Sequence, residues 1–172
     1  AMWIGGLDGG GQLHLAGQTY RQSGDDFFNG PVSNPAQYNS TFDNTWALTW
    51  NLRKSMIDSF RQGFYGVNTP AEILNWPGNG NTTIGQAAQL APYIDVNADN
   101  IYDPAAGDYP CIKGDEATFM IYNDDRNVHT ETGGQKMGIE VHAMLYGYKR
   151  PGSPLDSTVF INYKIYNRSA SG

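Results

Sequence analysis

Three long runs in the last third of the chain alternate apolar with other residues. This is the pattern of β-strands, whose successive side chains point to opposite faces of a sheet. The runs are Glu116–Asn123, Lys136–Arg150 and Asp156–Asn167. In the second and third runs both alternating sets are partly apolar, which indicates a sheet covered on both sides. The sequence therefore predicts a mainly β fold built on a sandwich-like antiparallel sheet.

The rest of the sequence favours turns. The chain has 172 residues, the usual size of one domain, with 21 Gly, 15 Asn and 13 Asp but only 4 Glu. Asp, Asn and Gly are turn residues, so we expect long ordered loops rich in them. Met2–Leu7 and Gln12–Arg21 read as a hairpin around the Gly-rich turn that begins at Asp8. One substantial helix is expected over Trp46–Gln62, from the three-to-four-residue spacing of its apolar side chains.

Charge and hydropathy exclude several classes of partner. The net charge is −6 and no basic stripe is present, so nucleic acid is not an expected partner. No run of 18 apolar residues occurs, so we expect no insertion into a membrane. The single cysteine, Cys111, cannot form a disulfide within the chain. Stability must then come from packing and, as the next motif indicates, from a metal.

The most specific motif is the loop that begins at Asp95. Calcium takes six to eight oxygen ligands, which a tight loop supplies from alternate positions. Positions 1, 3, 5, 7 and 9 of such a loop are occupied by Asp95, Asn97, Asp99, Ile101 through its carbonyl, and Asp103. Position 6 requires a left-handed backbone, and Asn100 is the best substitute there for glycine. The sequence therefore predicts a calcium site, against the alternative of an Asp/Asn-rich turn without metal.

The loop departs from the calcium pattern at position 12, where Ala106 replaces the closing carboxylate. The last ligand must come from elsewhere, and Asp108 or Asp115 could supply it. We include Asp108 in the predicted site.

A second polar group comprises His129, Glu140 and His142. Glu140 and His142 lie two residues apart on a predicted strand and so share a face, while His129 comes from the preceding turn. Two imidazoles and a carboxylate could bind zinc. No zinc signature accompanies them, so we expect a metal-free cluster joined by hydrogen bonds.

The other enzyme patterns are weak, and the sequence leans away from catalysis. No phosphate loop or nucleophile elbow is present, and Cys111 lacks the neighbours that would activate a thiol. Four tryptophans could form a sugar-stacking platform or belong to the core; they are Trp3, Trp46, Trp50 and Trp76.

Ten short phrases resemble one known group of proteins when they are taken in order. The phrases are Trp3–Asp8, Ala16–Gln22, Asn29–Val32, Trp76–Gly80, Leu90–Asn97, Gly107–Pro110, Asn123-Asp124, His129-Thr130, Gly138–His142 and Tyr166–Ser169. Together they resemble the N-terminal region of large secreted or cell-surface proteins of the Bacteroidetes that carry a type IX secretion sorting domain. The resemblance implies export to the outer cell surface or the extracellular space, but it implies no activity. Asn100 stands where that family usually has glycine. Asp156-Ser157-Thr158 resembles the short O-glycosylation motif of exported Bacteroidetes proteins, with Ser157 as the acceptor.

The sequence thus leads to one expected function and one alternative. We expect residues 1–172 to form a single extracellular β-rich domain, a fragment of a longer protein. It would serve as a non-catalytic, calcium-stabilised structural, adhesion or assembly module. Its partners would be other domains of the same protein or neighbouring subunits. The alternative is an accessory domain that binds or degrades polysaccharide.

Overall fold

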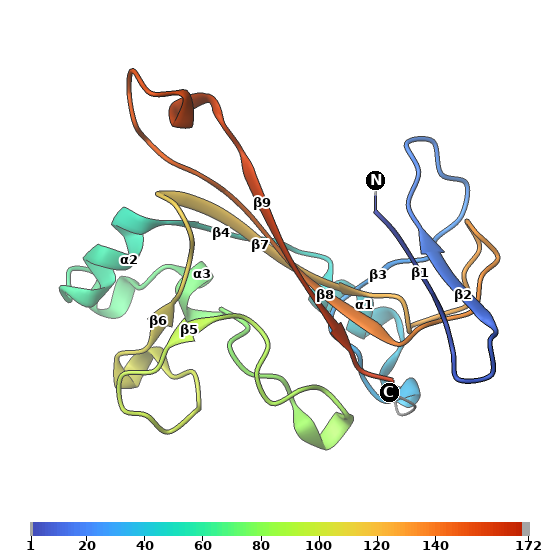
Figure 1. Ribbon diagram of the computed structural model, residues 1–172. Helices are drawn as coiled ribbons and strands as arrows, with labels where there is room; N and C mark the ends of the chain where they lie inside the picture. Colours follow the sequence, from blue (N-terminus) through green and yellow to red (C-terminus); the bar gives the residue numbers. More distant parts are fainter. Residues whose placement is uncertain (1, 170–172) are drawn as a thin grey trace.

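A single antiparallel sheet organises the structure, a computed structural model that describes residues 2–169. Within this range, five strands form the main sheet in the order β3, β7, β8, β9, and β4 also pairs with β7. They are β3 (Phe28–Asn29), β4 (Trp50–Arg53), β7 (Glu116–Asn123), β8 (Ile139–Gly147) and β9 (Phe160–Asn167). Figure 1 shows β7, β8 and β9 as long neighbouring strands. The prediction of a mainly β, antiparallel fold is confirmed.

The predicted hairpin is also present. β1 (Trp3–Leu7) pairs antiparallel with β2 (Leu13–Gly17). The carboxylate of Asp8 closes the turn, because its Oδ1 accepts from the amides of Gly10 at 2.8 Å and Gln12 at 2.9 Å. In Figure 1 this hairpin stands to the right of the main sheet, close to the ends of β8 and β9.

Three of the predicted strands are shorter than the sequence pattern indicated. β2 spans Leu13–Gly17 and not Gln12–Arg21. β8 begins at Ile139 rather than Lys136, directly after Gly138, whose φ of +68° interrupts the extended backbone. β9 begins at Phe160 rather than Asp156. Asp156 and Ser157 belong instead to the 3-10 helix η5 (Pro154–Ser157), which Pro154 starts because its ring fixes φ. Ser157, the predicted glycosylation acceptor, is exposed at the end of η5.

The predicted helix over Trp46–Gln62 is wrong. The structure places there the end of α1 (Ser40–Trp46), then strand β4, then α2 (Lys54–Arg61). β4 buries Trp50 and Leu52 and exposes Asn51 and Arg53, so the two buried side chains also satisfy a two-residue period. Pairing with β7 satisfies the backbone of β4 and places both side chains in the core, which outweighs the local helical spacing.

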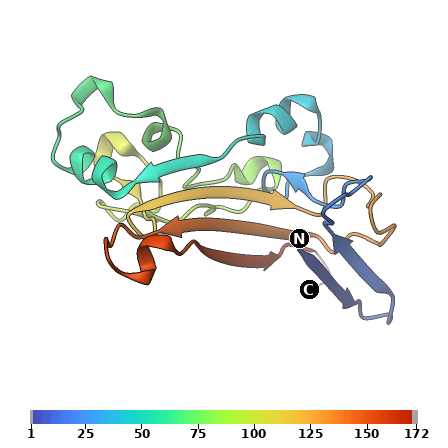
Figure 2. The same cartoon turned by 90° about the horizontal axis from the view of Figure 1, so that it is seen from above.

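Short elements and long loops form a layer on one face of the sheet. Figures 1 and 2 show α2, α3 and the β5–β6 pair grouped on one side of the long strands, with α1 beside the far end. These elements are η1 (Pro35–Gln37), η2 (Gly66–Asn68), α3 (Ala71–Leu74), η3 (Thr82–Ile84), β5 (Tyr93–Ile94), η4 (Pro104–Ala106) and β6 (Tyr109–Pro110). None of the helices in the described range is long and apolar enough to cross a membrane.

The core lies between this layer and the sheet. Its buried members are Trp50, Leu52, Ile73, Trp76, Leu90, Ala91, Ala117, Phe119, Ile121 and Met144. The indole nitrogens of Trp50 and Trp76 each donate to a backbone carbonyl, those of Asn75 and Pro92, so the rings are buried without losing a hydrogen bond. Trp46 packs against the same core. Three of the four tryptophans therefore build the interior and not a sugar platform, while Trp3 is 58% exposed.

The opposite face of the sheet is partly open. Ile161, Tyr163 and Ile165 of β9 share this face and are each about half exposed, at 51%, 47% and 53%. Closer to the hairpin, Tyr122 on the same face packs against the ring of Phe27. An uncovered apolar row of this kind is available for contact with another domain or subunit.

We expect truncation of the central aromatic to destabilise the fold strongly. Phe119 is 2% exposed and contacts the rings of Trp50 and Trp76. Phe119→Ala should lower the free energy of unfolding by about 3–5 kcal/mol, because it removes buried surface and leaves a cavity. Val67→Ala, at a 99% exposed position, should change it by less than about 0.5 kcal/mol. Urea denaturation of both variants measures the difference, and equal midpoints would contradict this account of the core.

Candidate functional site

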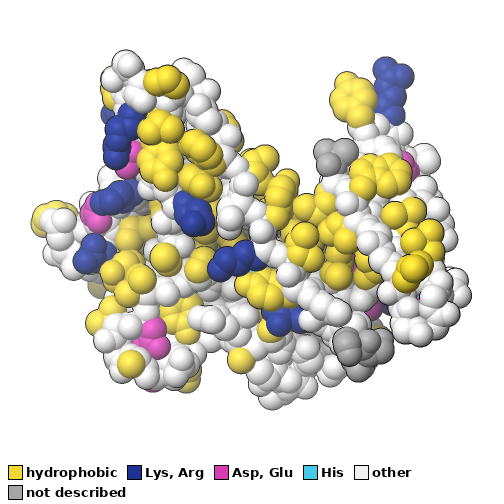
Figure 3. All heavy atoms as spheres, in the orientation of Figure 1, with side chains coloured by type: hydrophobic (Ala, Val, Ile, Leu, Met, Phe, Trp, Pro, Cys, Tyr) yellow, Lys and Arg dark blue, Asp and Glu magenta, His cyan; other side chains and the backbone are white. Residues whose placement is uncertain are grey.

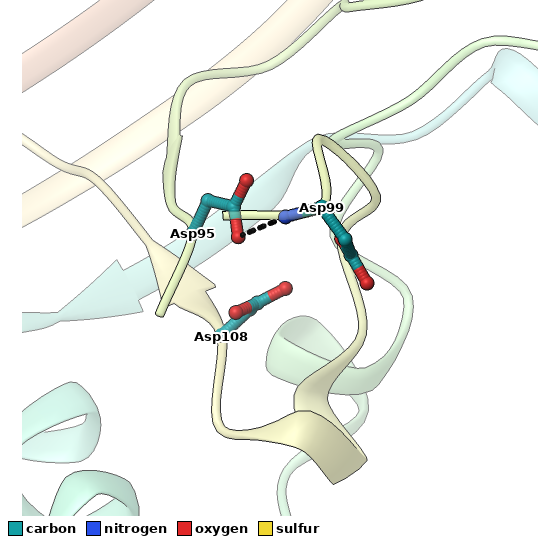
Figure 4. A group of neighbouring side chains, drawn as sticks. All are labelled: Asp95, Asp99 and Asp108. Carbon is teal, nitrogen blue, oxygen red and sulfur yellow. Dashed lines mark hydrogen bonds between the residues drawn. The ribbon is translucent and has the colours of Figure 1, made fainter. Parts of the chain in front are cut away.

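Three carboxylates converge in the loop between β5 and β6. The two strands pair antiparallel, which brings the two ends of the loop together. Asp95 follows β5, Asp108 precedes β6 and Asp99 comes from the middle of the loop. One oxygen from each of the three lies within 4.8 Å of the others. Figure 4 shows Asp95 and Asp108 on facing arms of the loop, with Asp99 across from them.

Two left-handed residues produce the tight curl of this loop. Ala98 has φ of +61° and Asn100 has φ of +63°. These bends turn backbone amides inward, and the amides of Ala98 and Asn100 donate to the carboxylate of Asp95 at 2.7 and 2.8 Å. The left-handed backbone expected at Asn100 is therefore present. The one at Ala98 was not expected, because alanine has no special preference for that region.

Some of the other predicted ligands lie beside this group of carboxylates, and one does not belong to it. Asn97 lies beside it, donating to Asp99 Oδ2 at 2.8 Å. The amide of Ile101 donates to Asp99 Oδ1 at 2.8 Å, and the Ile101 side chain is 60% exposed. Asp103 is not among the converging carboxylates; its Oδ1 accepts from the amide of Ala105 and caps η4.

Asp108, and not Asp115, closes the group. Asp108 is completely buried and accepts from the amides of Val96 at 2.8 Å and Asp103 at 2.9 Å. Asp115 lies elsewhere and accepts from Lys149 and Arg150.

The three aspartates form a donor set that suits a hard cation. Within residues 2–169, none of the ion pairs involves Asp95, Asp99 or Asp108, so three negative charges gather without a neutralising side chain. A carboxylate has about four lone-pair positions, so the amides already bound leave oxygen positions free. All-oxygen coordination favours calcium or magnesium over zinc or copper. No other group of His, Cys, Asp or Glu in the described range converges in this way.

The predicted histidine cluster divides into two separate parts. His142 Nε2 lies 2.8 Å from Glu140 Oε1, so these two side chains meet as expected. His129 does not join them. Its Nδ1 lies 2.7 Å from the carbonyl oxygen of Leu15 and its Nε2 lies 2.9 Å from that of Asp124. The separation arises because the turn that carries His129 folds toward β2 instead of over β8.

Glu140 is the centre of a buried charged group that the sequence did not reveal in full. It is completely buried and accepts from Arg168 Nη2 at 2.8 Å, in addition to its contact with His142. Its other oxygen accepts from the amide of Val32 at 2.9 Å. Burial by itself would raise the pKa of Glu140, but hydrogen bonds from His142 and Arg168 together outweigh it and lower that pKa.

Two further buried carboxylates were missed by sequence reasoning. Asp124 accepts from the amides of Met137 and Ile139, each at 2.7 Å, and burial raises its pKa. Asp26 accepts from the amide of Gly17 at 3.0 Å and from the hydroxyl of Thr132 at 2.6 Å. Both hold loops to strands. Asp124 could have been suspected from its place directly after a buried strand, whereas nothing local marks Asp26.

Comparisons with family models, curated proteins and solved structures gave no match. The chemistry of the residues is therefore the basis for the function proposed below.

We expect Glu140 to make the fold sensitive to acid. Its pKa is lowered in the folded state from the ordinary 4.5. The stability that the ionised Glu140 contributes is therefore fully present when the pH is above the ordinary pKa of 4.5. It is lost as the pH falls through the lower pKa of the folded state. Glu140→Gln should lower the free energy of unfolding by about 1–3 kcal/mol at pH 7, and this difference between the two proteins should be smaller at pH 3. Urea denaturation of both proteins across this range measures it, and a cost that does not change with pH would contradict the lowered pKa.

Proposed function

We propose that this chain is a non-catalytic, calcium-stabilised extracellular module of a secreted or cell-surface protein. The observation that carries the proposal is the convergence of Asp95, Asp99 and Asp108 without a neutralising cation. An ion bound there would join both ends of the loop to its middle. The ion would relieve the repulsion among the three carboxylates and stabilise the layer that covers the sheet.

Two observations support the extracellular setting of this proposal. Calcium sites of extracellular modules bind in the range of about 10⁻⁴–10⁻³ M, which suits a site with few protein ligands. Asp99 is exposed, so an ion would keep contact with solvent. The resemblance to exported Bacteroidetes proteins supports the same setting and export through type IX secretion, with Ser157 as an exposed candidate for glycosylation.

A role in adhesion or assembly draws support from the open face of the sheet. The half-exposed side chains of Ile161, Tyr163 and Ile165 would be covered by another domain or a neighbouring subunit.

The alternative function is that of a polysaccharide-binding or polysaccharide-degrading accessory domain. The observation that favours it is a cavity on the covered face of the sheet, lined by Tyr93, Tyr166 and basic side chains. Aromatic rings beside a few polar groups are typical of small-molecule sites.

Calcium should raise the stability of the protein, because a ligand that binds only the folded state stabilises it by mass action. With a dissociation constant of about 0.1–1 mM, about 10 mM calcium should add about 1.4–2.7 kcal/mol. The melting temperature should rise by roughly 3–10 °C. Differential scanning calorimetry with calcium and with a chelator measures this.

Matched variants locate the effect. Asp99→Asn should abolish the calcium-dependent shift, whereas Asp25→Asn, which makes the same charge change at an exposed position outside the loop, should retain it. Asp103→Asn should also retain it, because Asp103 caps η4 and is not among the converging carboxylates. An identical melting curve with and without calcium would refute the proposed role of the aspartates.

A further inference from the structure

Two of the three histidines join the β1–β2 hairpin to the loop between β7 and β8. His129 belongs to that loop, and its Nδ1 lies 2.7 Å from the carbonyl oxygen of Leu15 in β2. His14 belongs to β2 itself, and its Nδ1 lies 2.5 Å from the carbonyl oxygen of Lys136 in the loop. The amide of Leu15 donates to the carbonyl oxygen of Gln135. We call these contacts between β2 and the loop the hairpin seam.

The contacts of His129 require a hydrogen on both ring nitrogens. Its Nε2 lies 2.9 Å from the carbonyl oxygen of Asp124, so each nitrogen faces a carbonyl oxygen. A carbonyl oxygen can only accept, and a bare nitrogen would set one lone pair against another. The side chain of His129 is completely buried, so water does not replace a lost contact. Only the doubly protonated imidazolium makes both hydrogen bonds.

A buried carboxylate balances the charge of this imidazolium. Asp124 Oδ2 lies 3.7 Å from His129 Nε2, and both side chains are completely buried. The two carboxylate oxygens of Asp124 also accept from the amides of Met137 and Ile139, which favours the ionised form. Burial raises the pKa of Asp124, and the charge of His129 opposes that rise. The two side chains therefore stabilise each other in their charged forms.

His14 also has an acceptor on each side of its ring. Its Nε2 lies 3.2 Å from Oδ2 of Asp8, in addition to the contact of Nδ1 with Lys136. The backbone contact and then the carboxylate contact raise the pKa of His14 above its ordinary value of 6.5. The stability that protonated His14 contributes is therefore fully present below pH 6.5. It is lost as the pH rises through the higher pKa of the folded state.

The other charged groups around the two rings also favour protonation. Beside His14, a hollow between the hairpin and the ends of β8 and β9 is lined by Asp8, Asp125, Lys136 and Arg168, and Asp124 adds its charge from further away. Both cations of this set are paired, Lys136 with Asp125 and Arg168 with Glu140. Beside His129, the hydroxyl of Thr132 contacts both the carbonyl of Leu15 and the carboxylate of Asp26.

The hairpin that the seam holds carries exposed apolar side chains. Trp3, Leu7 and Leu13 are 58%, 70% and 58% exposed. Figure 3 shows hydrophobic side chains over this part of the molecule, at the right of the view that it shares with Figure 1. The strength of the seam therefore sets how rigidly the protein presents this apolar surface.

We propose that the hairpin seam is a pH-sensitive fastening, which is firm while His14 and His129 are doubly protonated and loosens as the pH rises above neutrality. Loss of a proton leaves one nitrogen of each ring with a lone pair that faces an oxygen. At His129 it also leaves the buried carboxylate of Asp124 without its counter-charge. The seam contains none of the three aspartates of the β5–β6 loop, so the inference goes beyond the proposed calcium site and does not depend on it.

Nuclear magnetic resonance of the nitrogen-labelled imidazole rings tests the protonation directly. At about pH 7, both nitrogens of His129 should carry a hydrogen, whereas a free histidine is then mostly neutral. A bare nitrogen in His129 at this pH would overturn the proposal.

Amide hydrogen exchange tests the loosening. The protection factor of the Leu15 amide, corrected for the intrinsic effect of pH on exchange, should fall at least about tenfold between about pH 6 and pH 8.5, the loss expected for one hydrogen bond. The amide of Ala143 in the centre of the sheet is the internal control and should keep its protection. Equal protection of Leu15 at both pH values would overturn the proposal, and so would an equal fall at Ala143, which would place the change in the whole fold.

Histidine variants assign the effect to the seam. Glutamine does not titrate, so His129→Gln should remove most of the pH dependence at Leu15, and His14→Gln should reduce it. His142→Gln, which changes the histidine that contacts Glu140 in the sheet, is the matched control and should retain the full dependence. If His129→Gln fails to fold, His14→Gln decides the outcome, because its ring is partly exposed. An undiminished pH dependence in His14→Gln would overturn the proposal.

Discussion

The backbone of β7 is the constraint on which the rest of the structure depends. Along one edge its whole length pairs with β8, and along the other it pairs with β4 and then with β3. A buried strand must satisfy its amides and carbonyls, so both edges need partners. The second edge is supplied by two short segments from distant parts of the chain, and they bring α1 and α2 with them. The inward side chains of β7, from Ala117 to Ile121, then form the floor of the core.

Buried carboxylates solve a second problem, which is how so many loops pack without regular secondary structure. Asp26, Asp108, Asp124 and Glu140 are each no more than 1% exposed, and each accepts from backbone amides of a loop or strand end. Hydrogen bonds to an ionised acceptor are about twice as strong as those between neutral groups. An Asp-rich sequence can therefore hold its loops by charge-assisted bonds, where the layer has few long helices.

Two groups of residues use these buried acids in different ways. At the β5–β6 loop, the buried Asp108 is placed by the amides of Val96 and Asp103, and it lies with the carboxylates of the partly buried Asp95 and the exposed Asp99. On the covered face of the sheet, the carboxylate of Glu140 is satisfied by Arg168 and His142. One group gathers like charges that need a cation. The other neutralises its acid internally.

Features of the fold that depend on neighbouring residues could be predicted from the sequence. Features that depend on pairing with a distant segment of the chain could not. The alternation in β7 to β9, the hairpin turn at Asp8 and the left-handed Asn100 depend on residues within a few positions, so their physics is contained in the sequence around them. The prediction of a helix around Trp50 was wrong because the apolar spacing there suits a helix. The segment forms a strand because it pairs with the edge of β7 that β8 leaves free, and that edge comes from a distant part of the chain.

The candidate sites divide in the same way. The sequence by itself determined that an oxygen-rich loop begins at Asp95 and that Glu140 and His142 share a face. Only the tertiary structure decided that Asp108 rather than Asp115 meets Asp95 and Asp99, while Asp103 caps η4. It also decided that His129 contacts the carbonyl oxygen of Asp124 and that Lys164 pairs with His142 across β8 and β9. Each of these outcomes depends on which distant segment pairs with which, and that choice is made by the hydrogen bonding and burial of the whole sheet rather than by any local preference.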